Sequence, residues 1–170
     1  MASHQLFILF SVLLLSSCLA FITVSAEEHP VEKRAHVVVE GVVYCQSCQR
    51  HGTWSLGGGA KPMASAKVSV ICKDHKDRVN FYKVFATNED GYFYGELDGF
   101  KMGHYILDHP LHACVVRLVA SPNMSCNYPT NVNYGINGAS LRYENKVLFG
   151  SDYEAVVYSA GPLAYRPSSC

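Results

Sequence analysis

Short runs of apolar residues recur along the chain, some β-branched and aromatic and some with alternating apolar and polar positions, which is the pattern of β-strands. The first run covers residues 36–45, where β-branched and aromatic residues surround Gly41, and we expect a bulge or a close backbone approach at that glycine. Six further runs lie at 66–73, 80–86, 92–97, 104–107, 113–119 and 154–158. No apolar stripe of helical spacing persists for three turns. The pattern therefore predicts an all-β fold, a roughly seven-stranded antiparallel β-barrel or sandwich.

Turn signals separate these runs. Asp90-Gly91, between the runs at 80–86 and 92–97, is a strong hairpin signal because glycine tolerates a positive φ. Residues 52–62 contain three consecutive glycines and predict a surface loop, and residues 121–140 form a long polar stretch rich in Asn, Gly, Pro and Tyr.

The amino-terminal segment has the composition of a signal peptide. Residues 1–26 contain no Lys, Arg, Asp or Glu, and the apolar run at 6–15 is shorter than the roughly 20 residues of a membrane span. Small residues at 24–26 suit a cleavage site. We expect a signal peptide at 1–26, a charged leader at 27–35 and one domain at 36–170. No later segment is expected to span a membrane, and the protein is expected to be secreted.

Cysteine usage agrees with secretion. Of seven cysteines, Cys18 leaves with the signal peptide, and an even number remains in an oxidising compartment, which predicts three disulfides. The spacing of Cys45 and Cys48 also suits a redox dithiol or half of a zinc site. A redox site would need a helix amino terminus, and zinc would need a second cysteine pair, so structural disulfides are the favoured interpretation. Spacing alone permits all fifteen pairings.

Charge and candidate catalytic groups exclude several functions. The chain has 14 basic and 14 acidic residues, so nothing favours nucleic acid or an anionic membrane as a partner. His104, His109 and His112 are candidate metal ligands, but Pro110 bends the segment and the three rings need not converge. We expect no metal and no other cofactor. The acidic residues near the turns suit solvation better than catalysis, and we expect a protein that is not an enzyme.

Two kinds of residue are candidate surface sites. Asn123-Met124-Ser125 is an acceptor for N-linked glycosylation. The chain has eleven tyrosines, and packing in or at the edge of the core is the favoured role for most of them. Tyr128, Tyr134 and Tyr165 are the candidates that we expect to be exposed and able to stack on sugar rings.

Several motifs together resemble one family. They are residues 40–48 (EGVVYCQSC), the segment from Pro62 to Cys72, residues 87–93 (TNEDGYF) and the other three cysteines. In combination they are similar to the plant pollen Ole e 1 allergen and extensin family over residues 36–170. The likeness is greatest to members whose domain ends non-classical arabinogalactan and proline-rich cell-wall proteins. Two departures stand out: Pro30 is the one proline in residues 27–35, and Gln46 stands where many relatives have Asp.

The resemblance implies a secreted plant glycoprotein with a β-barrel or sandwich and no catalytic residues. It also implies the pairs Cys45–Cys126, Cys48–Cys170 and Cys72–Cys114. We expect a wall-associated protein that binds pectin or arabinogalactan glycans, and other wall proteins as further partners, in growing or tip-growing tissue. The alternative is a secreted signalling or interaction protein that recognises a receptor or another protein partner.

Overall fold

The computed structural model describes residues 34–51, 53 and 58–170. The predicted signal peptide at 1–26 and most of the predicted leader at 27–35 lie outside the described residues. Arg34 and Ala35 are the first residues of strand β1.

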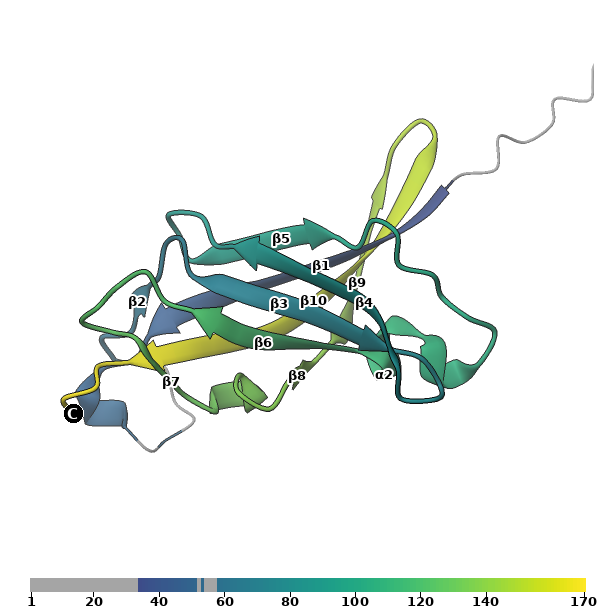
Figure 1. Ribbon diagram of the computed structural model, residues 1–170. Helices are drawn as coiled ribbons and strands as arrows, with labels where there is room; N and C mark the ends of the chain where they lie inside the picture. The colour runs from purple at the N-terminus through teal and green to yellow at the C-terminus, as the bar shows by residue number, and fades with distance from the viewer. Residues whose placement is uncertain (1–33, 52, 54–57) are drawn as a thin grey trace, which may run out of the picture. The chain divides into compact units, whose positions relative to one another are not determined.

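Two β-sheets make up the described domain (Figure 1). The six-stranded sheet contains β1 (Arg34–Cys45), β2 (Lys61–Pro62), β5 (Tyr92–Glu96), β7 (Tyr128–Pro129), β9 (Arg142–Phe149) and β10 (Tyr153–Arg166). The four-stranded sheet has the order β4 (Val79–Ala86), β3 (Lys67–Lys73), β6 (Cys114–Ala120), β8 (Ala139–Ser140). The helical segments are short: η2 (Cys48–Arg50), η3 (Ile106–Asp108), α2 (Pro110–Ala113) and η4 (Val132–Tyr134).

Strands β1 and β10 run parallel and pair along almost their whole length, from Arg34 opposite Tyr153 to Cys45 opposite Tyr165. On the far side of β1, β5 and β2 pair antiparallel with successive segments of the strand. On the far side of β10, β9 and β7 do the same. The two long strands therefore form the centre of the six-stranded sheet.

The core lies between the sheets and is filled by the inward-facing residues of both. In the four-stranded sheet, Val68, Val70 and Val116 are each 0% exposed. In the six-stranded sheet, Val39 and Phe93 are equally buried. Burial of a side chain of this size contributes about 1.5–3 kcal/mol. These apolar contacts join the sheets into one core cluster.

The predicted all-β fold with three disulfides is confirmed, with two separate sheets rather than a closed barrel. The expectation of a wholly antiparallel arrangement is wrong at β1 and β10. The predicted strand at 104–107 is also wrong. Ile106 and Leu107 are 76% and 55% exposed, and the segment turns into η3 because the buried carboxylate of Asp108 accepts a hydrogen bond from the backbone of His75.

The predicted turn at Asp90-Gly91 exists, but the predicted hairpin does not. Gly91 has φ +72°, and the Asn88 side chain accepts hydrogen bonds from the backbone of Asp90 and Tyr92. Strand β4 pairs with β3, whereas β5 pairs with β1 in the other sheet. The Gly91 carbonyl accepts a hydrogen bond from the backbone N–H of Val43, so the turn carries the chain from one sheet to the other.

The predicted irregularity at Gly41 is confirmed. The register of β1 against β10 shifts between Gly41 and Val43. A β-carbon at position 41 would overlap the carbonyl oxygen of Ala160 and would lie 2.6 Å from the Phe93 ring. Glycine is needed here because Phe93 and β10 approach the backbone this closely.

The three disulfides join Cys45 to Cys126, Cys48 to Cys170 and Cys72 to Cys114. These are the pairs that the family resemblance implies. They differ in exposure: Cys48 and Cys170 are exposed, whereas Cys72 and Cys114 face the core and are 0% and 1% exposed.

Tyr165 is a core residue, so the expectation that it is exposed is wrong. Strand β10 continues past Gly161 and Pro162, and the alternation of its side chains turns Tyr165 inward, where it is 2% exposed. Its hydroxyl has no hydrogen-bond partner among the described residues. Burial raises the pKa of this hydroxyl to about 12.

Mild reduction of the native protein should open the Cys48–Cys170 disulfide first, because thiol exchange requires access to the sulfur atoms. The Cys72–Cys114 disulfide should react only when the domain unfolds. Partial reduction, alkylation and peptide mass spectrometry would measure the order. Simultaneous labelling of all six cysteines under native conditions would contradict this expectation.

Replacing Tyr165 with Phe should leave the free energy of unfolding at pH 7 unchanged or raise it by about 1 kcal/mol, because it removes a buried hydroxyl without a partner. The hydroxyl keeps its proton in the folded state to a higher pH than in the unfolded chain. The unfolded chain therefore loses this proton first, so the free energy of unfolding is unaffected below pH 10 and falls as the pH rises towards 12. Urea unfolding across this range should show a smaller loss in Tyr165→Phe than in the unchanged protein; equal losses would rule the effect out.

Candidate functional site

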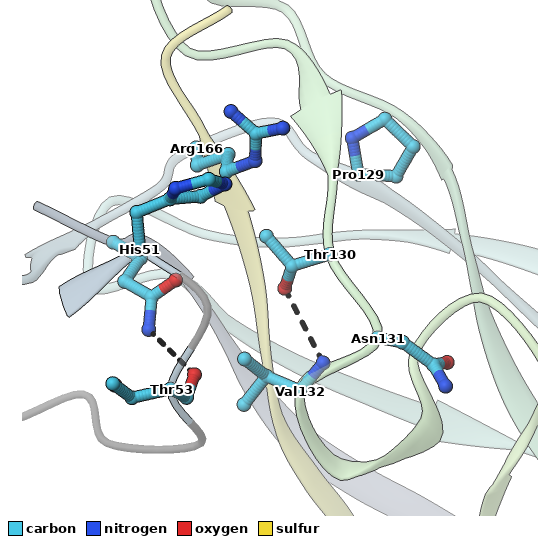
Figure 2. Close-up of a pocket in the computed structure, with 8 residues that line it drawn as sticks. His51, Thr53, Pro129, Thr130, Asn131, Val132 and Arg166 are labelled. Carbon is cyan, nitrogen blue, oxygen red and sulfur yellow. Dashed lines mark hydrogen bonds between the residues drawn. The ribbon is translucent and has the colours of Figure 1, made fainter. Parts of the chain in front are cut away.

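A groove of about 380 Å³ lies where the ends of three segments meet. Its walls come from the segment after β1, from β7 and the residues that follow it, and from the end of β10, as Figure 2 shows. The lining residues are Gln46, His51, Thr53, Pro129, Thr130, Asn131, Val132 and Arg166. We call this the His51–Arg166 groove.

The last residues of β10 hold the walls of the groove in place. The carbonyl of Ala164 accepts hydrogen bonds from the backbone N–H of Thr130 at 3.1 Å and from the Thr130 hydroxyl at 2.7 Å. The carbonyl of Tyr165 accepts one from the backbone N–H of Gln46 at 2.8 Å. Both walls are thus bonded to consecutive residues of one strand.

Gln46 supports the floor of the groove. This residue is 1% exposed, and its Nε2 donates a hydrogen bond of 3.2 Å to the carbonyl of Thr53. An amide suits this place because the carbonyl needs a donor, and an ionised carboxylate only accepts. Gln46 therefore makes a contact that an ionised Asp at this position would not make.

Arg166 lines the groove, and Tyr128, next to the lining residue Pro129, contacts it; we call this pair the rim of the groove. The Arg166 guanidinium lies 4.2 Å from the centre of the Tyr128 ring, within the range of a cation–π contact. It also donates to the carbonyl of Pro167 at 3.2 Å. Arg166 forms no ion pair with a carboxylate among the described residues. The rim therefore combines a half-exposed aromatic ring with a positive charge that is available to an acidic ligand.

The structure places the three predicted tyrosines differently. Tyr128 is 52% exposed on β7 at the rim, and Tyr134 is 56% exposed at the end of η4, two residues after the groove residue Val132. Tyr165 lies in the core, as described above. Sequence reasoning missed His51 and Arg166, because nothing local to either residue shows that the ends of β1, β7 and β10 meet.

The three candidate histidines do not form a metal site. His109 caps α2, where its Nδ1 accepts the backbone N–H of Leu111 at 3.3 Å, and its ring centre lies 6.4 Å from that of His112. His104 is exposed in the segment before η3. Within residues 34–51, 53 and 58–170, no three His, Cys, Asp or Glu side chains are placed to bind a metal together.

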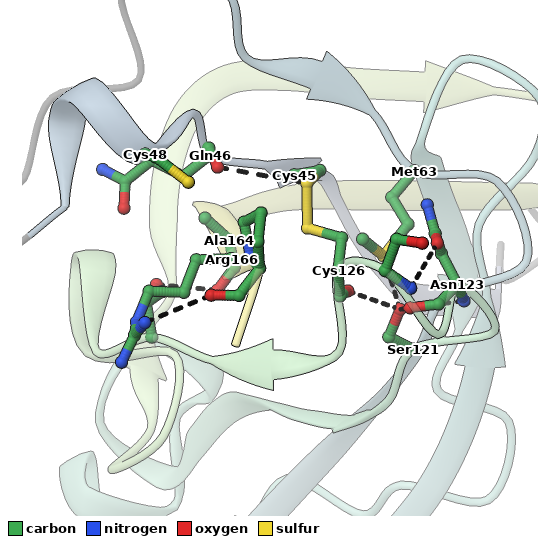
Figure 3. Close-up of a disulfide and its surroundings, with 12 residues drawn as sticks. Cys45, Gln46, Cys48, Met63, Ser121, Asn123, Cys126, Ala164 and Arg166 are labelled. Carbon is green, nitrogen blue, oxygen red and sulfur yellow. Dashed lines mark hydrogen bonds between the residues drawn. A yellow bond between two sulfur atoms is a disulfide. The ribbon is translucent and has the colours of Figure 1, made fainter. Parts of the chain in front are cut away.

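Asn123 lies beside the Cys45–Cys126 disulfide, as Figure 3 shows, and is exposed. The Ser121 hydroxyl donates to the carbonyl of Cys126 at 2.9 Å, and the Asn123 side chain accepts the backbone N–H of Ser125 at 2.9 Å. A hollow of about 450 Å³ adjoins this turn. Asn123 is one of the residues that line this hollow.

A group of polar residues on the six-stranded sheet is satisfied by internal contacts. Glu40 accepts hydrogen bonds from the Lys146 ammonium at 2.8 and 3.1 Å and from the Tyr92 hydroxyl. Burial alone would raise the pKa of Glu40, but these contacts outweigh it and lower the pKa. A carboxylate that is paired in this way suits a structural role.

No helix in the described part of the chain is both long enough and apolar enough to cross a membrane. No protein-family model matches the sequence.

Three plant proteins show clear sequence similarity. The non-classical arabinogalactan protein 30 of Arabidopsis thaliana is 30% identical over 136 residues, 78% of this chain. The pistil-specific extensin-like protein of Nicotiana tabacum is 34% identical over 62% of the chain, and the proline-rich protein 3 of Arabidopsis thaliana is 29% identical over 75%. The chain spans 53%, 22% and 36% of the length of these relatives, respectively.

A solved structure shows the same fold. The crystal structure of the major plantain pollen allergen Pla l 1 matches 79% of this chain and 99% of its own chain, with a TM-score of 0.53 and 23% identity. The resemblance drawn from the cysteines and motifs is thereby confirmed: this chain is a homologue of plant arabinogalactan, extensin-like and proline-rich proteins, and it has the fold of an Ole e 1-like pollen allergen.

Proposed function

We propose that this chain is a secreted, non-enzymatic protein of the plant cell wall that binds an acidic wall polysaccharide, of the pectic or arabinogalactan type, in the His51–Arg166 groove. The observation that carries the proposal is the rim of this groove, where Arg166, which pairs with no carboxylate among the described residues, lies against the half-exposed Tyr128. The names of the relatives support wall association.

The chemistry of the rim suits an acidic sugar. A guanidinium can donate two parallel hydrogen bonds to one carboxylate, the group that distinguishes a uronic acid from a neutral sugar. One face of the Tyr128 ring contacts Arg166, and the exposed part of the ring can pack against the C–H groups of the next sugar. Thr130, Asn131 and His51 add polar groups along the walls.

The groove is also prepared for binding. Its walls are bonded to Ala164 and Tyr165 before any ligand arrives, and the Cys45–Cys126 and Cys48–Cys170 disulfides restrain neighbouring parts of the chain. A site that is already ordered loses less conformational entropy on binding.

Replacing Arg166 with Gln should weaken retention on pectin by about tenfold, because it removes one charge-assisted contact. Replacing Tyr128 with Ala should weaken it severalfold. Affinity electrophoresis or pull-down with pectin and with arabinogalactan would measure both effects. Tyr94→Ala is the matched control, because Tyr94 is 47% exposed on β5, away from the groove, and should bind normally.

Lack of retention of the folded, disulfide-intact protein on both polysaccharides would contradict the proposal. Crosslinking in intact walls provides a second comparison. Recovery with polysaccharide would support the proposal, whereas recovery with a membrane protein would support the alternative of a signalling or interaction protein.

We also propose that Asn123 carries an N-linked glycan. Protein secreted from a plant host should lose mass on treatment with a peptide-N-glycosidase, and Asn123→Gln should migrate at the deglycosylated position without treatment. Because Asn123 is exposed at a turn outside the groove, polysaccharide retention should not change. An unchanged mass after treatment would show that the acceptor is not used.

A further inference from the structure

Another hollow, of about 530 Å³, lies on the outer face of the four-stranded sheet. It lies at the end of the sheet where β3 turns into β4, and Figure 1 shows α2 near this end. This volume falls in the range of about 300–1,000 Å³ that is typical of sites for small molecules. It is formed by different strands from the His51–Arg166 groove. We call it the Arg117 hollow.

The floor of the Arg117 hollow is apolar. Ile71 and Val115 are paired across β3 and β6, and both turn their side chains away from the core, because their neighbours Val70, Cys72, Cys114 and Val116 face inward. Val79 and Leu107 continue the apolar surface and are 57% and 55% exposed. Such aliphatic groups form a surface on which a flat apolar molecule loses its contact with water.

Arg117 supplies a positive charge at the edge of this floor. Its Nε donates a hydrogen bond of 2.9 Å to the carbonyl of Asn137, which fixes the guanidinium plane. Two carboxylates line the hollow and already have partners: Asp77 pairs with Lys73 at 2.8 Å, and Asp74 pairs with Arg78 at 2.6 Å. Arg117 itself pairs with no carboxylate in the described part of the chain.

The walls are held by buried polar contacts. Asp108 is 4% exposed, and its Oδ1 accepts the backbone N–H of His75 at 2.7 Å, which joins the turn after β3 to η3. The ring of His75 lies 4.1 Å from that of Tyr105, centre to centre. On the inner face of the same two strands, the Cys72–Cys114 disulfide links β3 to β6. The hollow is therefore built on restrained elements.

We propose that the Arg117 hollow binds a small organic carboxylate with a flat apolar body, such as an aryl-substituted acid. Its carboxylate accepts hydrogen bonds from the Arg117 guanidinium, and its ring packs on Ile71 and Val115. Charge complementarity selects this ligand: Arg117, which has no carboxylate partner within the described residues, matches one carboxylate, and the aliphatic floor matches a ring without hydroxyl groups. A sugar acid would leave its hydroxyl groups against the aliphatic floor without partners, at a cost in free energy.

Titration of the ¹⁵N-labelled, disulfide-intact protein with cinnamate tests this proposal. We expect saturable shifts of the amide signals of Ile71, Val115 and Arg117. Cinnamamide, which has the same shape without the charge, should bind at least about tenfold more weakly. The Arg117→Gln variant should lose affinity for cinnamate to the same extent.

Lys67→Gln is the matched control, because Lys67 is an exposed cation on β3 outside the hollow, and its loss should not change the affinity. If Arg117→Gln does not fold, Val79→Ser tests the apolar floor at an exposed position and should weaken binding severalfold. Equal affinities for cinnamate and cinnamamide would overturn the proposal. So would shifts confined to other parts of the domain, or no shifts up to the solubility limit of cinnamate. Retention on pectin does not depend on this hollow, so the two proposals fail independently.

Discussion

The parallel pairing of β1 with β10 is the contact on which the rest of the six-stranded sheet depends. Along one edge, β1 and β10 pair with each other. Along its other edge, each of them pairs with two shorter strands. A two-residue strand such as β2 or β7 has too few hydrogen bonds to form without a longer neighbour. The shorter strands are therefore positioned by the pair at the centre.

The same pairing positions the His51–Arg166 groove. Strand β1 ends at Cys45 and β10 ends at Arg166. One wall of the groove is the segment that follows β1, and the other is hydrogen-bonded to the last residues of β10. The disulfides of Cys45 and Cys48 restrain the chain at this end of the sheet. The groove therefore depends on strand register. A shift of one residue would turn Tyr165 out of the core and would turn Arg166 away from the groove.

Much of the fold could be predicted from sequence because several strands carry a local signal. The run at 36–45 is rich in β-branched and aromatic residues, and Gly41 marks the place where the register of β1 against β10 shifts. Strand β9 gives no comparable signal: most of Arg142–Phe149 is exposed on both faces, and the strand forms because β10 offers it an edge. The apolar Ile106 and Leu107 suggested a strand, but apolar composition does not show that an edge is available to pair with.

The candidate sites were less predictable for the same reason. Tyr128 could be proposed from its polar surroundings, whereas Arg166 acquires its role only through the contact with Tyr128, 38 positions away. Arg117 similarly acquires its role through Asn137 and through the pairing of its strand with β3. Contacts between residues far apart in the sequence depend on how the strands pair, so the local sequence around each residue does not predict them.

The order of the strands along the chain also determines when the domain can form. Because β10 follows every other strand of the described domain, its partner β1 has one long edge unpaired until the end of synthesis, although the four-stranded sheet needs no residue after Ser140. An unpaired strand edge is open to wrong partners. The polar residues His36 and Glu40 within β1 reduce this risk. The six-stranded sheet therefore stays incomplete, and exposed to wrong pairing, until its last strand has been synthesised.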